Sequence, residues 1–380
     1  MAWIERHGPT WRVRYYREDG RIATENGYTS RASARDRADD LDYERRRGIS
    51  PTPPTDPITL SEWIDLWRAG HDVSAATWQK YNSYLRNHIL PAFGDKHLGD
   101  IKRVTVKTWV KGLRRHLGDA TIAGIVNLLS ALLAEAVDNE LITTNPCRRL
   151  GLTLDPAERR EIATPARLLQ IAERCGRYRP LIITAAYTGL RWGELTGLQW
   201  ANVALDRYPY ATITVDPDTG ALHELAGGLE LGPPKTPASA RTVHLPPFLT
   251  TLLRNHAADQ DAHQNFVFTG PRGGLLRRSN FNRRVWQPAV AGDPTHGWTP
   301  LQPQLDFHGL RHTHKSWMDE DRIHQVLQHA RLGHRMPGVR GIYSHVTEPM
   351  TDHLITQLEH RWHRTQPDPS AGMARLTAVA

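Results

Sequence analysis

The sequence predicts a multidomain, mainly α-helical protein with small β elements. The chain of 380 residues is longer than a typical single domain. A proline-rich stretch, ISPTPPTDP at 49–57, has the composition of an extended linker. After it, apolar residues recur mainly at the spacing of amphipathic helices. We therefore expect a small domain at 1–50, a helical domain at 58–146, a larger mixed α/β domain at 160–362 and a disordered tail at 363–380.

The first domain is predicted to be a three-stranded sheet with one helix. Residues Trp11–Tyr16 begin with the alternation of a strand, and Asp19-Gly20 is a hairpin signal. Further strands are expected at Arg21–Ala23 and near Gly27–Thr29. The charged stretch Arg31–Arg47, with alanines and a leucine between the charges, is predicted to be helical.

The second domain is predicted to be a four-helix bundle. Thr59–Glu62 matches a capping box, which starts a helix. The chain is expected to leave the bundle at Asn145-Pro146. The apolar positions that predict the helices are Trp63, Ile64 and Trp67; Trp78, Tyr81, Leu85 and Ile89; Val106, Trp109, Val110 and Leu113; and Ile122, Ile125, Val126, Leu129, Leu132, Leu133 and Val137.

The third domain is predicted to be mostly helical. It follows a second linker at Leu152–Arg160 and begins with Thr164-Pro165, a helix cap followed by proline in the first turn. Strands are expected at Ala211–Val215 and Arg241–Leu245, the second preceded by a hairpin turn. A last amphipathic helix is expected at Met350–His360.

Five residues of this domain have the chemistry to attack a phosphodiester. Its non-bridging oxygens carry negative charge, which Arg191 in TGLRWGEL and Arg311 in HGLRHTH could hold with planar guanidinium groups. Such preorganised donors typically contribute about 3–4 kcal/mol each. Tyr343 could serve as the nucleophile if a base accepts its proton, and His308 and His334 titrate near neutral pH. A covalent ester would conserve the energy of the broken strand, so ATP would not be needed.

Each residue alone also has an ordinary structural interpretation. An isolated H-x-x-R is more often a solvated basic helix face, and Lys235 alone is an ordinary exposed lysine. Arg191 with Glu194 three residues later is usually a surface ion pair. However, the apolar run LIITAAY before Arg191 predicts a buried helix start, where a charge needs a partner or a ligand.

Several histidines of this region also suggest a metal site, which we consider the weaker interpretation. No HExxH or Cys-His cluster accompanies them, and the sequence has two cysteines, Cys147 and Cys175. We therefore expect no metal. The histidines concerned are His308, His312, His314, His324 and His329.

Taken together, Arg191, Lys235, the H-x-L-R helix, the L-G-H and the following tyrosine resemble the tyrosine recombinases, the phage integrase family. The resemblance implies that Tyr343 attacks DNA and that Arg191 and Arg311 hold the phosphate. It implies that His308 and His334 donate to the phosphate or move protons. By the same resemblance Lys235, in K-T-x-x-S-x-R-x-V, protonates the leaving 5′ oxygen, and Glu194 supports the site.

The resemblance extends over essentially the whole chain. It implies an arm-type DNA-binding domain at 1–50, a SAM-like core-binding domain at 58–146 and the catalytic domain at 160–362. A small β domain for protein contacts is the alternative for 1–50. The implied function is site-specific recombination at DNA attachment sites, which integrates or excises a mobile element such as a viral genome. The implied route passes through a Holliday junction in a homotetramer, without metal or nucleotide cofactor, with a possible DNA-bending accessory protein and an excision factor.

Two segments depart from the family pattern. The family usually has a glycine soon after the H-x-L-R helix, where this chain has Met318–Asp321. Residues Met336–Gly341 lack the common threonine before the nucleophile. The second departure leaves open whether Tyr343 is delivered in cis or in trans.

The charge of the chain fits a polyanionic partner. The formal net charge is +8 and the pI is about 9.6. Two cysteines, with neither a signal-peptide region nor a membrane-length apolar run, favour the bacterial cytoplasm, in association with the nucleoid, and no membrane contact. Ser279 or Asn280 is expected to cap a helix with two of the DNA-contact candidates. These candidates are Arg12, Arg14, Lys80, Arg86, Lys107, Lys111, Arg283 and Arg284.

Three other functions agree less well with the sequence. A type IB topoisomerase shares the chemistry but lacks the arm-like front and the integrase-style bundle. A DNA-binding regulator without catalysis would have no use for a nucleophile. A metal-dependent nuclease is the weakest alternative, and activity that survives EDTA would exclude it.

Overall fold

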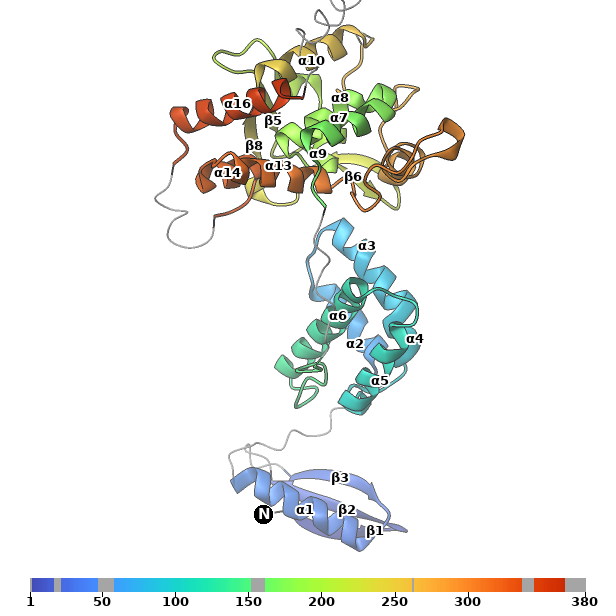
Figure 1. Cartoon of the computed structure of the whole chain (residues 1–380). Coiled ribbons are helices and arrows are strands. Elements are labelled where there is room, and N and C mark those ends of the chain that lie inside the picture. Colours follow the sequence, from blue (N-terminus) through green and yellow to red (C-terminus); the bar gives the residue numbers. More distant parts are fainter. Residues whose placement is uncertain are drawn as a thin grey trace, which may run out of the picture. The chain divides into compact units, whose positions relative to one another are not determined.

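The computed structural model describes residues 2–16, 22–46, 58–151, 161–261, 263–336 and 345–365. The chain divides into two compact units, residues 1–156 and 157–380 (Figure 1). Three hydrophobic cores form within them: one in the N-terminal sheet, one in the helical bundle and one in the second unit. The predicted fold class, mainly α with small β elements, is confirmed.

The N-terminal sheet has the order β1-β2-β3, with β1 at Trp3–His7, β2 at Thr10–Tyr16 and β3 at Ile22–Tyr28, all antiparallel. Helix α1, Arg31–Arg46, packs on it (Figure 1). The prediction of three strands was right in number but wrong in place. It missed β1, whose side chains do not alternate in burial, and it split β3 in two.

The cause of the split is a bulge in β3. The pairing shifts register where Trp11 lies opposite Tyr28 while Val13 lies opposite Glu25. Gly27 absorbs the extra residue with φ of +95°. In the sequence, Asn26 and Gly27 look like the end of a strand, so the continuation was not predicted. The hairpin signal at Asp19-Gly20 lies outside the described residues.

The helical bundle contains the four predicted helices, α2, α3, α5 and α6. The capping box is confirmed: Thr59 accepts from Glu62 N, and the Glu62 carboxylate accepts from Thr59 N at 2.8 Å. The bounds are Leu60–Gly70 for α2, Ala75–Tyr84 for α3, Leu90–Phe93 for the short α4, Arg103–Leu113 for α5 and Asp119–Asp138 for α6.

Helix α6 is long and apolar enough to cross a membrane by length and composition. Its apolar side chains instead form the centre of the bundle. Ile122, Ile125, Leu129 and Leu132 are fully buried there. Burial of this face stabilises the bundle.

The second unit begins with α7, whose cap is as predicted: Thr164 accepts from Arg167 N. The predicted strands pair antiparallel in the sheet order β4-β5-β8, and β6 and β7 form a separate hairpin. The bounds are Pro165–Arg174 for α7, Arg179–Thr188 for α8, Trp192–Thr196 for α9, Val203–Ala204 for β4, Thr212–Val215 for β5, Ala221–Leu225 for β6, Gly228–Gly232 for β7, Arg241–His244 for β8, Pro247–Ala258 for α10, Arg278–Phe281 for α11, Gln287–Ala291 for α12, Gly309–Glu320 for α13, Gln325–Leu332 for α14 and Glu348–His363 for α16.

Two predictions about this unit were wrong. The segment before β8 is not a turn between paired strands, because β7 and β8 belong to different sheets and Lys235 lies in the link between them. Ser279 and Asn280 lie inside α11 and do not cap it; Arg277 is the cap residue. The Glu224 carboxylate accepts from Arg278 N at 2.7 Å, so a side chain from β6 replaces a local cap.

The predicted C-terminal helix is confirmed as α16, which is longer than expected. Leu354 and Leu358 are buried in the core of the second unit. Arg361 pairs with Asp321 at 2.7 Å and so connects α16 to the end of α13. The tail beyond 365 lies outside the described residues.

Candidate active site

The turn between α8 and α9 places Arg191. Gly189 ends α8 in the left-handed conformation, with φ of +68°, and Arg191 is the N-cap residue of α9. Glu194 accepts from Arg191 N at 2.9 Å, which fixes the start of the helix. The predicted Thr-Gly turn and the helix start at Arg191 are therefore confirmed.

Glu194 is a buried carboxylate that connects two guanidinium groups. It accepts from Arg191 Nη1 at 2.7 Å and from Arg241 Nη2 at 3.0 Å. Its side chain is 2% exposed. Burial alone would raise the pKa of Glu194, but Arg241 and then Arg191 hold it below the ordinary value. The ion pair is thus internal, unlike the surface pair that its i,i+3 spacing suggests.

Arg311 lies on α13 and is 5% exposed. Its Nη1 donates to the Gly189 carbonyl at 2.5 Å, and its Nη2 donates to the Leu332 carbonyl and, at 2.9 Å, to His334 Nε2. Burial, and then the charge of Arg191, lower the pKa of Arg311 to about 9. The side chain remains charged near neutral pH, held by the ends of α8 and α14.

His334 follows Gly333, which ends α14 in the left-handed conformation. A guanidinium group can only donate, so Nε2 of His334 must accept and its ring proton must lie on Nδ1. Partial burial, and then Arg311 and Arg191, lower the pKa of His334 to about 4. The ring is therefore neutral near pH 7, and its Nε2 is occupied by the hydrogen bond from Arg311.

Two further residues belong to this cluster. Ser239 Oγ accepts from Arg191 Nη1 at 2.7 Å, and Arg241 Nη1 donates to the Ser239 carbonyl at 2.7 Å. Sequence reasoning named Arg241 only as a strand residue and did not select Ser239. The sequence did contain a signal for both residues, because Ser239 and Arg241 are the serine and the arginine of the K-T-x-x-S-x-R-x-V pattern around Lys235.

The other three catalytic candidates are His308, Lys235 and Tyr343. His308 is the half-buried N-cap residue of α13, with its ring centroid 5.2 Å from that of His312. Lys235 is exposed, and among the described residues it makes no hydrogen bond to the cluster. Tyr343 lies outside the described residues, in the gap between Met336 and His345.

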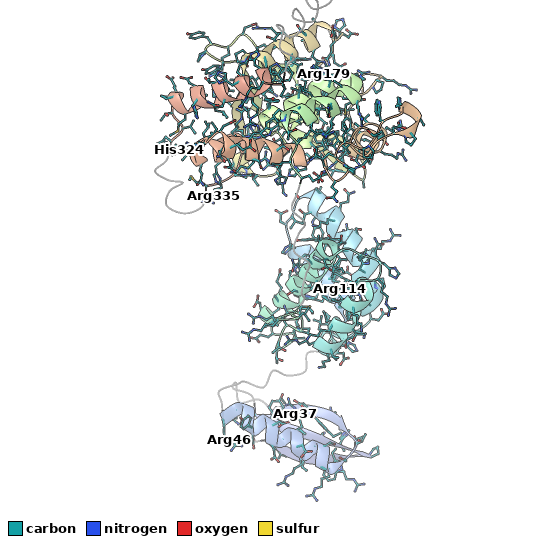
Figure 2. The ribbon with its side chains drawn as sticks, viewed as in Figure 1. Arg37, Arg46, Arg114, Arg179, His324 and Arg335 are labelled. Carbon is teal, nitrogen blue, oxygen red and sulfur yellow. The ribbon has the colours of Figure 1, made fainter. Side chains whose placement is uncertain are left out.

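Most DNA-contact candidates are exposed. Arg12 and Arg14 are half-buried and both pair with Glu5, at 2.7 and 3.4 Å. Arg335 is exposed and follows His334 directly, and Figure 2 labels it. The exposed candidates are Lys80, Arg86, Lys107, Lys111, Arg283 and Arg284.

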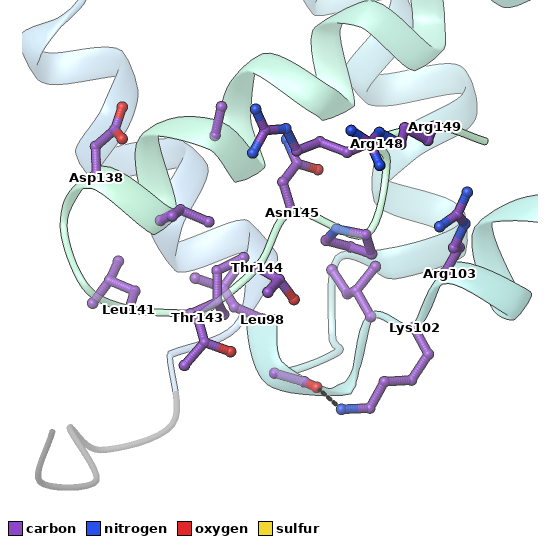
Figure 3. Close-up of a pocket in the computed structure, with 16 residues that line it drawn as sticks. Leu98, Lys102, Arg103, Asp138, Leu141, Thr143, Thr144, Asn145, Arg148 and Arg149 are labelled. Atoms are coloured by element: carbon purple, nitrogen blue, oxygen red, sulfur yellow. Dashed lines mark hydrogen bonds between the residues drawn. The ribbon is translucent and has the colours of Figure 1, made fainter. Parts of the chain in front are cut away.

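The helical domain has a basic cavity of about 1060 Å³. It lies between the end of α6 and the turn before α5 (Figure 3). Asn145 keeps the chain in place there, donating to the Ser130 carbonyl at 2.8 Å. The residues that line the cavity include the acidic Asp138 and four basic residues: Lys102, Arg103, Arg148 and Arg149.

The cluster in the second unit is built for an anion. Glu194 pairs with both Arg191 and Arg241, and Arg311 forms no ion pair with a carboxylate of the described residues, so positive charge is in excess. Buried charge in excess is costly unless a counter-charge binds. Across the described ranges, no group of three or more His, Cys, Asp or Glu side chains is arranged to hold a metal ion. The ligand class that fits is a phosphate or similar oxyanion.

Comparisons with known proteins agree with this chemistry. The model of the phage integrase N-terminal SAM-like domain matches residues 59–114, and the phage integrase family model matches 164–349. The integrase of Mycobacterium phage D29 is 28% identical over 287 residues, which is 74% of this chain and 72% of that protein.

Solved structures share the fold. The Tn1549 transposon integrase in complex with transposon right end DNA has a TM-score of 0.64 at 18% identity, covering 79% of this chain and 99% of that one. A lambda integrase tetramer bound to a Holliday junction has a TM-score of 0.54 at 18% identity, covering 91% and 98%. The resemblance seen in the sequence is thereby confirmed: the chain belongs to the phage integrase family, the tyrosine recombinases.

Proposed function

We propose that this chain cleaves and rejoins DNA at specific attachment sites through a 3′-phosphotyrosine intermediate. The observation that carries the proposal is the arginine cluster: Arg191 and Arg241 pair with the buried carboxylate of Glu194, while Arg311 has no carboxylate partner among the described residues. Such a cluster stabilises the extra negative charge that a phosphodiester gains in the transition state.

In the cleavage step, Tyr343 Oη attacks the scissile phosphorus. The Tyr–O–P bond forms and the bond from phosphorus to the 5′ oxygen breaks. Arg191 and Arg311 hold the non-bridging oxygens, since their guanidinium groups are already fixed by Glu194 and by backbone carbonyls. Fixed donors need no reorganisation as charge develops.

Two proton movements accompany this step. His334, neutral with Nε2 as an acceptor, is suited to take the Tyr343 proton once the phosphate draws Arg311 toward itself. Lys235 gives a proton to the leaving 5′ oxygen; its exposed position on the β7–β8 link would let it approach bound DNA. His308, at the start of α13, donates to the phosphate.

Rejoining reverses the chemistry on another strand. A 5′-OH from the partner duplex attacks the phosphotyrosine, the P–O bond to Tyr343 breaks, and the tyrosine regains its proton. Two such exchanges pass through a Holliday junction in a homotetramer; the lambda integrase tetramer on a Holliday junction supports this assembly. Integration or excision of a mobile element in the bacterial cytoplasm, with a DNA-bending protein and an excision factor, completes the proposal.

DNA contacts extend beyond the site. The exposed lysines and arginines of α3 and α5 and the basic cavity of the helical domain would follow the phosphate backbone. The N-terminal sheet, with Arg12 and Arg14 on β2, would bind outlying arm sites.

Covalent capture tests the proposal. Nicked duplexes from DNA flanking the gene are incubated in EDTA with the native chain or with Tyr343→Phe, then separated under denaturing conditions. We expect a protein–DNA adduct with the native chain alone and equal DNA binding by both. Adducts with both proteins would refute Tyr343 as the nucleophile. Sequence-specific binding without any adduct would favour a regulator.

A further inference from the structure

Arg331, in the last turn of α14, is 4% exposed and uses all three guanidinium nitrogens. Nε donates to His314 Nε2 at 2.9 Å, Nη1 to the His244 carbonyl at 2.9 Å and Nη2 to the Tyr187 carbonyl at 2.8 Å. These partners come from α13, from the end of β8 and from the last turn of α8. A single side chain therefore joins three elements to α14.

The charge of Arg331 is not neutralised by any carboxylate in the described part of the chain. Its partners are two carbonyls and one imidazole. Burial, and then the charge of Arg241, lower the pKa of Arg331 to about 9. An apolar side chain would fill this place at lower cost if packing were its only task. The presence of a buried guanidinium group at this position therefore needs an explanation other than packing.

His314 is completely buried on α13 and must be neutral, because its Nε2 accepts from a guanidinium group. Burial, and then Arg331, hold its pKa well below the ordinary value. The ring lies against Gly189: a Cβ added there would come within 2.9 Å of His314 Cδ2. The Gly189 carbonyl in turn accepts from Arg311.

The backbone around Arg331 holds two arginines of the active site. The Arg331 carbonyl accepts from Arg241 Nε at 2.6 Å, and the Leu332 carbonyl accepts from Arg311 Nη2. His334 follows after the turn at Gly333. The position of this turn therefore sets the orientation of both guanidinium groups and of the imidazole.

We propose that Arg331 and His314 form a positioning pair, which fixes the last turn of α14 so that Arg311 and His334 meet the scissile phosphate in the right orientation and Arg241 keeps its place beside Glu194. Both side chains are buried, so the pair acts on the phosphate through the groups that it positions. The inference rests on the proposed function of Arg311 and deepens it.

A purely structural role would give a different result. If the pair served only packing, its loss would lower the melting temperature and the amount of folded protein without changing the chemistry per folded molecule. If the pair orients the phosphate-binding groups, its loss slows cleavage while DNA affinity stays nearly constant. A misplacement of ~1 Å in such groups can cost about 100-fold in rate.

The experiment measures single-turnover adduct formation, DNA affinity and melting temperature for Arg331→Met, Arg331→Lys and His314→Phe. Two nicked substrates are compared: the ordinary phosphodiester, and a methylphosphonate in which one non-bridging oxygen at the scissile position is a methyl group. The neutral substrate has less charge for arginines to hold. Arg174→Met is the matched control, since Arg174 also donates to two carbonyls, those of Ala289 and Thr299, neither of which binds an arginine of this cluster.

We expect Arg331→Met and His314→Phe to cleave the phosphodiester ~30- to 100-fold more slowly, with DNA affinity within about threefold of native. On the methylphosphonate, the loss of cleavage rate relative to the native chain should be several-fold smaller. Arg331→Lys should recover part of the rate. Arg174→Met should have the same rate ratio on the two substrates as the native chain.

A native rate in the variants, or equal loss on both substrates, would overturn the inference. If Arg331→Met does not fold, His314→Phe decides, because it keeps a planar aromatic ring and removes the acceptor. Arg311→Ala is measured in parallel: a native rate there would reject the proposed function itself, whereas a slow Arg311→Ala with unaffected pair variants would reject only the positioning pair.

Discussion

Arg311 donates from Nη2 to Nε2 of His334 at 2.9 Å, so the phosphate-holding cation and the imidazole beside it are one hydrogen-bonded unit. The bond requires a neutral ring. It also means that His334 can gain a proton on Nε2 only when Arg311 releases it. A bound phosphate would attract the guanidinium, which couples substrate binding to the basicity of the imidazole.

The lowered pKa of His334 predicts a contribution to stability that depends on pH. The unfolded chain takes up the proton near the ordinary 6.5, but the folded chain does so only near 4. Between these values the unfolded state binds more protons, so stability falls as pH falls from 6.5 toward 4. His334→Gln removes this titration. Urea unfolding at pH 7.5 and 5 should therefore show a smaller acid-induced loss for the variant; equal losses would contradict the assignment.

Glu194→Gln removes the carboxylate between Arg191 and Arg241. Breaking a buried ion pair by removing one partner costs about 3 kcal/mol. We expect that loss in urea unfolding at pH 7, when the native carboxylate is ionised. Because the variant leaves positive charge uncompensated, added sulfate should stabilise it more than it stabilises the native chain. An unchanged unfolding midpoint would show that Glu194 does not balance this charge.

Some of the site could be predicted because its signals are local. Arg191 and Glu194 follow an apolar helix and a glycine turn, and Arg311 stands three residues after His308. These residue types and spacings carry the chemistry within one short segment. The fold class followed in the same way from helical spacing and linkers.

The rest depended on tertiary contacts. Nothing near Arg331 in the sequence shows that it meets His314 on another helix and His244 at the end of a strand. Likewise, the sequence near Glu194 does not show that its carboxylate is buried, because its partner Arg241 comes from β8. The β6–β7 hairpin, in contrast, could have been predicted from the sequence, because Gly227-Gly228 between two leucine-containing runs is a turn signal.

Lys235→Ala should slow cleavage of ordinary DNA by ~100-fold or more, as expected for loss of a general acid. A substrate with sulfur in place of the bridging 5′ oxygen needs no proton on its leaving group, so the variant should cleave it nearly as fast as the native chain. Lys315→Ala is the control, because that lysine pairs with Asp319. The control should keep the native rate ratio between the two substrates. Failure of the sulfur substrate to rescue Lys235→Ala would remove Lys235 from the role.

Gly189→Ala tests how the end of α8 supports Arg311. Gly189 has φ of +68°, and an added Cβ would lie 2.7 Å from Leu332 Cδ2 and 2.9 Å from His314 Cδ2. The left-handed backbone costs about 1–2 kcal/mol for alanine. Crowding in a packed core adds about 1–3 kcal/mol. Since the Gly189 carbonyl accepts from Arg311, the shift should also slow cleavage.

Gly297→Ala separates the two effects. Gly297 has nearly the same φ, +67°, but an added Cβ would meet nothing within 4 Å. This variant should lose only the backbone part, about 1–2 kcal/mol, and should cleave DNA at the native rate. Both variants are compared by urea unfolding and by single-turnover adduct formation. Equal stability losses and native rates in both would mean that contact between Gly189, Leu332 and His314 has no part in holding Arg311.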